Sequence, residues 1–70
     1  MRYLIVVEKS ETGFSAYSPD VPGCVATGAT EVETESKMRE AIEFHLDGMK
    51  EEGLPLPEAS ARSAYVEIPA

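Results

Sequence analysis

A single amphipathic stretch between Thr30 and Gly53 is the strongest constraint on the fold of this chain. Thr30 is a typical helix N-cap, and Glu33 three residues later completes the capping-box pattern. Gly53 is a typical residue just beyond a helix end, and the two prolines that follow it prevent continuation. The sequence therefore predicts one helix over residues 31–52, which leaves a short segment on each side to complete the fold.

The predicted helix has an apolar side and an acidic side. At about 100° per residue, one stripe collects the apolar positions and the opposite stripe collects charged ones. The apolar stripe consists of Thr34, Met38, Ala41, Ile42, His45 and Met49, with Leu46 at its edge. The opposite face consists of Ser36, Glu40, Glu43, Asp47 and Glu51. We expect the apolar stripe to pack on a sheet and the acidic face to meet solvent.

Runs rich in β-branched and aromatic residues predict strands on both sides of the helix. They cover residues 3–8, 14–18 and 24–27 before the helix, and residues 62–68 after it. Pro22 and Gly23 fit the central positions of a type II turn before the third strand. The order is β-β-β-α-β, an α+β fold with a mostly antiparallel sheet, and residues 1–70 form one domain.

The small size of this domain predicts self-association. One helix can cover only one face of a four-stranded sheet, yet the first strand is apolar on both faces. Cys24 is the only cysteine, so no internal disulfide can compensate for the small core. We therefore expect a homo-oligomer, a dimer or a tetramer. Tyr3, Tyr17 and Phe44 are the expected contacts with a partner or another copy. Large amphipathic aromatic residues such as tyrosine are common interface anchors, and Phe44 lies off the main apolar stripe of the helix.

The charge balance excludes some partners. The formal net charge is -7 and the six Lys and Arg residues are scattered, so we expect no direct binding to nucleic acid and a preference for a basic partner. No apolar run approaches the ~20 residues of a membrane span, and the first residues do not resemble a signal peptide. We expect a cytoplasmic protein.

No residue pattern predicts catalysis, a cofactor or a metal. His45 lies inside the apolar stripe, and Cys24 follows a turn at a strand start, so both fit packing positions. The three acids outside the helix, Glu8, Asp20 and Glu67, have no spacing that demands a metal. We expect neither catalytic nor cofactor-binding nor metal-binding residues.

Together these motifs resemble the N-terminal domain of HicB-type antitoxins over nearly the whole chain. The motifs are Tyr17-Ser18-Pro19-Asp20-Val21-Pro22-Gly23-Cys24, Gly28-Ala29-Thr30, the helical run Met38 to Leu46, and Gly53-Leu54-Pro55-Leu56-Pro57. The resemblance implies a partial RNase H-like fold, in which the strand order is 3-2-1-4 and the last strand lies beside and parallel to the first. It also implies an antitoxin that binds and occludes HicA, a small basic RNA-cleaving toxin.

Two features distinguish this sequence from relatives of that kind. RNase H enzymes carry a carboxylate in the middle of their first strand, where this chain has Leu4-Ile5-Val6-Val7, so we expect no nuclease activity. The chain reaches Ala70 directly after the last predicted strand. We therefore expect no ribbon-helix-helix or helix-turn-helix domain of the kind that HicB-type antitoxins use to bind DNA.

The leading hypothesis is a non-catalytic, HicB-like protein-binding module whose partner is a small basic HicA-like toxin. The alternative is an orphan oligomeric domain that binds a small ligand or another protein, without a toxin partner. Hydrolysis by His45 or Cys24 is a third and weaker alternative.

Overall fold

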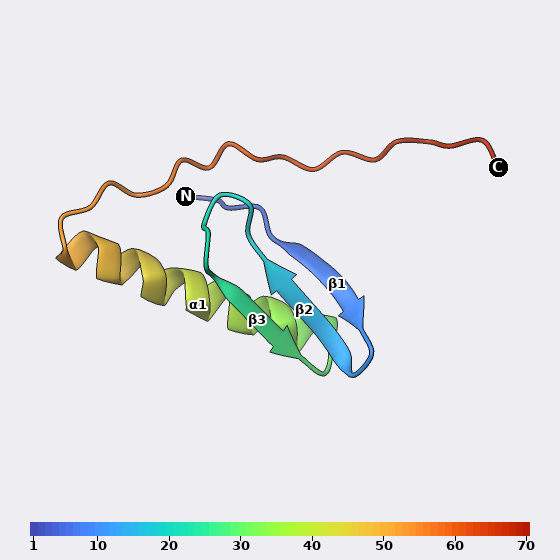
Figure 1. The fold of residues 1–70 in the computed structure, drawn as a ribbon, viewed down its shortest axis with the longest axis horizontal. Coiled ribbons are helices and arrows are strands. Elements are labelled where there is room, and N and C mark those ends of the chain that lie inside the picture. Colours follow the sequence, from blue (N-terminus) through green and yellow to red (C-terminus); the bar gives the residue numbers. More distant parts are fainter.

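The computed structural model describes residues 1–70 and shows three strands followed by one helix (Figure 1). The elements are β1 (Val6–Ser10), β2 (Gly13–Tyr17), β3 (Val25–Gly28) and α1 (Glu31–Glu51). The sheet is antiparallel with the order β1-β2-β3, and α1 packs across one of its faces. The α+β class is confirmed, and the sheet contains three strands where four were predicted.

The helix begins where the capping box predicts. Thr30 is extended, and its Oγ1 accepts a hydrogen bond of 3.1 Å from the Glu33 N–H. The Glu33 carboxylate accepts in turn from the Ala29 N–H, at 3.4 Å, and pairs with Lys37 at 3.0 Å. Chiefly because of its hydrogen bond and ion pair with Lys37, the Glu33 carboxyl has a pKa below its usual value.

The helix ends at Glu51, one residue before the predicted end. Gly53 adopts a positive φ of 69°, which a residue without Cβ reaches at low cost. Its N–H donates to the Lys50 carbonyl at 3.1 Å, and the Leu54 N–H donates to the Met49 carbonyl at 2.9 Å. This pair of bonds is a Schellman motif, so Gly53 has the role that the sequence predicted for it.

The first strand was predicted over residues 3–8, and the sheet pairing begins only at Val6. Val6 pairs with Tyr17, the last residue of β2. Beyond Tyr17 the chain leaves the sheet, and Pro19 has no N–H for a ladder. A side-chain hydrogen bond takes the place of backbone pairing there: the Ser18 Oγ donates to the Leu4 carbonyl at 2.8 Å. The second and third strands are each shifted by one residue from the predicted bounds.

The predicted strand over residues 62–68 is wrong for this structure. Residues 54–70 form neither helix nor strand, and the chain beyond Ala61 runs past β1 and away from the body (Figure 1). No backbone hydrogen bond joins this segment to the sheet. A β-rich sequence forms a strand only beside a partner edge, and here Tyr65, Val66 and Ile68 are exposed instead. We call residues 62–70 the C-terminal arm.

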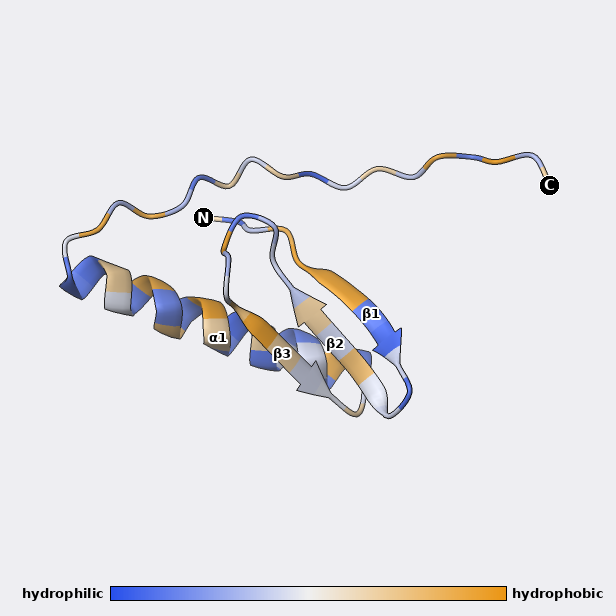
Figure 2. Cartoon of the chain, in the orientation of Figure 1, coloured by the Kyte–Doolittle hydropathy of each residue, from blue (hydrophilic) through white to orange (hydrophobic).

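The core lies between the sheet and α1. It consists of Ala16, Val21, Cys24, Met38 and Ile42, with Tyr3, Ile5, Val7, Ala26 and Leu46 packed against it. The predicted apolar stripe of the helix is confirmed, since Thr34, Met38 and Ile42 are buried in this layer. Hydrophilic (blue) and hydrophobic (orange) segments alternate along the helix, as an amphipathic helix requires (Figure 2).

Candidate partner-binding surfaces

The loop that connects β2 to β3 contributes the core residue Val21. Val21 is fully buried between two tight turns, closed by hydrogen bonds of 3.3 Å from its N–H to the Ser18 carbonyl and from the Cys24 N–H to its own carbonyl. Gly23 has a φ of 87°, as the third residue of a type II turn requires. The turn that the sequence predicted thus places Val21 in the core.

Asp20, in the same loop, binds the segment that leads into the C-terminal arm. Its Oδ2 accepts a hydrogen bond of 2.8 Å from the Ala61 N–H, and its Oδ1 accepts one of 3.2 Å from the Ser60 Oγ. Sequence reasoning weighed Asp20 only as a metal ligand. A short acidic residue followed by Val-Pro-Gly carries no signal for a partner 40 residues away, so this role emerges only in the fold.

Tyr3 connects the beginning of the chain to the segment that follows the helix. Its hydroxyl donates a hydrogen bond of 2.6 Å to the Pro57 carbonyl, and its ring packs against the core. With the Asp20 contacts, this bond fixes residues 57–61 beside the first residues of the chain. Tyr3 is therefore half-buried and engaged within its own chain.

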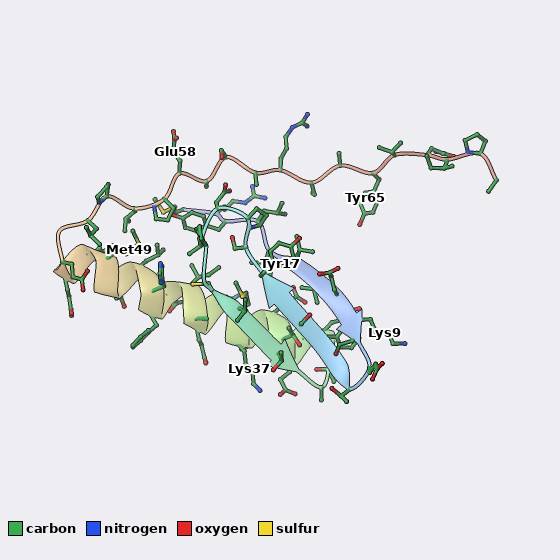
Figure 3. All side chains as sticks on the ribbon, in the orientation of Figure 1. Lys9, Tyr17, Lys37, Met49, Glu58 and Tyr65 are labelled. Carbon is green, nitrogen blue, oxygen red and sulfur yellow. The ribbon has the colours of Figure 1, made fainter.

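Tyr17 lies on the face of the sheet that α1 does not cover (Figure 3). Val7, Ala16 and Ala26 face the helix, so their neighbours along the strands point the other way. The register aligns Val6, Tyr17 and Val25 in one row across the three strands. Tyr17 is 44% exposed and Val25 69% exposed. We call this row the open sheet face.

Phe44 lies on the solvent side of α1 and is 82% exposed. At helical spacing its neighbours are Glu40, Asp47 and Glu51, all exposed. Lys37 is the nearest base along this row, and it is already paired with Glu33. We call Phe44 and these three carboxylates the outer helix face.

The structure thus separates the three aromatic residues singled out in the sequence. Tyr3 is half-buried and bonded within its own chain, Tyr17 belongs to the open sheet face, and Phe44 belongs to the outer helix face on the opposite side of the two-layer body. Tyr17 and Phe44 therefore lie on two separate exposed surfaces, and Tyr3 is bonded to Pro57 within its own chain.

The residues weighed for catalysis lie in packing positions. Cys24 is buried, its Sγ lies 3.8 Å from the Ala41 carbonyl oxygen, and burial raises the pKa of its thiol. A thiol of this kind resists conversion to the nucleophilic thiolate. His45 is half-buried on the apolar stripe of α1. No group of three or more His, Cys, Asp or Glu side chains is arranged to hold a metal ion.

A hollow of about 490 Å³ opens between the first residues of the chain and α1. Its lining is Met1, Arg2, Tyr3, Ile5, Glu35, Arg39, Ile42, Glu43 and Leu46. The hollow lies on the β1 side of the molecule, where the predicted fourth strand is missing. It combines apolar walls with two acids and two bases.

Comparison with known proteins identifies the family. The family model described as the HicB-like antitoxin of bacterial toxin–antitoxin systems matches residues 3–70. The chain belongs to the HicB-like antitoxin family. The resemblance seen in the sequence is thereby confirmed over nearly its whole length.

A solved structure agrees with this membership. A chain of the HicA3 and HicB3 toxin–antitoxin complex superimposes with a TM-score of 0.72 at 33% sequence identity. The match covers 86% of this HicB-like chain and 70% of that chain.

Sequence relatives of the HicB-like chain come from a phage, an archaeon and a bacterium. The "uncharacterized 14.9 kDa protein in rep-hol intergenic region" of Haemophilus phage HP1 is 39% identical over 69 residues. That match spans 99% of this chain and 52% of the phage protein, so the chain spans about half the length of this relative. UPF0150 proteins of Helicobacter pylori and Thermoplasma acidophilum are 37% and 28% identical, and the matches span 89% and 97% of those proteins.

The single helix of the structure does not combine the length and the apolar character that crossing a bilayer requires.

Proposed function

We propose that this HicB-like chain is a non-catalytic cytoplasmic antitoxin module that binds a small basic HicA-like toxin and occludes its RNA-cleaving site. The observation that carries the proposal is the similarity to a chain of the HicA3 and HicB3 toxin–antitoxin complex, at 33% identity and a TM-score of 0.72. The family match over residues 3–70 supports the same role.

The outer helix face is the surface that best fits a basic toxin. Complementary charge steers association and disfavours wrong partners. The chain has a net charge of -7, which favours a basic partner. Phe44 adds an exposed aromatic side chain in a row with three carboxylates, so that an apolar anchor lies next to negative charge. The open sheet face offers no comparable density of charge, since Glu8 is the only acid on its three strands.

Substitution of Phe44 tests this surface. Isothermal titration with a HicA-like toxin is expected to give a Kd about tenfold or more weaker for Phe44→Ala than for the natural chain. A double substitution, Glu40→Lys with Asp47→Lys, is expected to slow association and to remove most of the salt dependence.

Val32 supplies the matched control, because it is 77% exposed on the same helix but lies away from the outer helix face. Val32→Ala is expected to bind the toxin like the natural chain. Equal Kd values for Phe44→Ala and Val32→Ala would contradict the choice of surface. No binding of the natural chain at micromolar concentration would contradict the antitoxin function itself.

A further inference from the structure

The C-terminal arm is built like a strand but has no partner within its own chain. Tyr65, Val66 and Ile68 are 102%, 79% and 72% exposed. β-branched and aromatic residues of this kind favour strands, and leaving them in water is unfavourable. The ring of Tyr65 lies on the arm, away from the sheet and α1 (Figure 3).

The sheet has two free edges, the outer edges of β1 and β3, and the arm begins on the β1 side, because residues 59–63 lie beside residues 2–5, which lead into β1. β1 pairs with β2 on one side only, so the backbone groups on its other side are free to pair with a further strand. The hollow of about 490 Å³ lies along the approach to this edge, between residues 1–5 and α1. A strand laid along β1 would direct alternate side chains toward the α1 side of the sheet and the rest toward the open sheet face.

The placement of residues 57–61, which form the root of the arm, explains why the arm does not pair with the β1 edge of its own chain. Residues 59–63 lie beside residues 2–5, where together they line a second hollow. Two hydrogen bonds fix this placement: the Tyr3 hydroxyl donates to the Pro57 carbonyl, and the Ala61 N–H donates to the Asp20 carboxylate. Beyond it the arm continues outward while β1 turns down into the sheet, and the molecule reaches 49 Å in its longest dimension against 27 and 16 Å in the others (Figure 1).

We propose that two copies of this chain exchange their arms, so that residues 64–68 of each copy form the fourth strand on the β1 edge of the other. Each copy carries one free β1 edge and one unpaired arm, so a two-fold arrangement satisfies both needs and closes. Main-chain pairing along an exposed edge is an established mode of recognition between chains. The fourth strand that the sequence predicts thereby forms between copies.

Light scattering and hydrogen exchange on the full chain test this exchange. We expect a dimer at high micromolar concentration that dissociates on dilution. Amide protection of residues 6–10 and 64–68 should rise together as the dimer forms. A monomer at all concentrations, or protection of residues 64–68 that does not depend on concentration, would overturn the proposal.

A matched pair of valine substitutions separates arm exchange from other association. Val66→Asp and Val32→Asp place the same charge at two equally exposed valines, one on the arm and one on α1. Val66→Asp is expected to give a monomer with unchanged helical circular dichroism, and Val32→Asp a dimer. A dimer for Val66→Asp that Tyr17→Asp dissociates would instead assign the contact to the open sheet face and overturn arm exchange.

Discussion

Gly28 shows how closely α1 approaches the sheet. A Cβ at this position would lie 2.6 Å from the Thr34 Oγ1 and 3.0 Å from its backbone nitrogen. Thr34 cannot easily move aside, because it is fully buried and donates a hydrogen bond of 2.7 Å to the Thr30 carbonyl. The hydrogen atom of glycine is therefore part of the packing between the two layers.

Alanine substitutions at two glycines test this close contact. Gly28→Ala is expected to lower the free energy of unfolding by about 1–3 kcal/mol, as overpacking does. Gly48→Ala, in the helix interior with nothing within 4 Å of the added Cβ, is expected to raise it by about 0.5–1 kcal/mol. Urea unfolding measures both. Equal effects of the two substitutions would contradict the packing described.

Asp20 is the other residue whose role depends on a specific contact. Asp20→Ala removes two hydrogen bonds to the root of the arm, one of them from a backbone N–H to a carboxylate. We expect a loss of about 1–2 kcal/mol in the free energy of unfolding and faster hydrogen exchange at the Ala61 amide. Glu58→Ala, at an exposed position of the same segment, serves as the control. Unchanged exchange at Ala61 in Asp20→Ala would show that the root is held by other contacts.

At the scale of elements, local signals were sufficient for the helix. Thr30, Glu33 and Gly53 bond within a few residues of themselves, so the sequence specifies both helix ends almost to the residue. The apolar stripe needed only helical periodicity. Strand ends were less predictable, because Val6 begins the ladder only where Tyr17 provides a partner on the next strand.

The last strand shows the limit of local reasoning. Tyr65, Val66 and Ile68 have strand composition, but a strand requires an edge at the right place. Asp20 and Tyr3 determine where the arm begins, and each acts on a residue at least 40 positions away in the sequence. Residue spacing and composition do not predict contacts between residues so far apart in the sequence. The same holds for the contact aromatics, since sequence could name Tyr3, Tyr17 and Phe44 but could not separate the half-buried one from the exposed two.

At the scale of the whole molecule, the two proposed partners occupy separate surfaces. α1 covers one sheet face, and its outer helix face, with Phe44 in a row of carboxylates, is the surface proposed for a basic toxin. The β1 edge and the C-terminal arm are the surfaces proposed for a second copy. Because these surfaces differ, a substitution that dissociates the copies need not weaken the outer helix face.

RNA cleavage by the HicA-like toxin, measured with increasing amounts of this chain, tests the antitoxin function most directly. We expect cleavage to fall in proportion to the added chain and to stop once the toxin is saturated, since an occluding partner acts by binding. The chain alone should leave the RNA intact. Cleavage that continues unchanged in the presence of excess chain would contradict the proposed function.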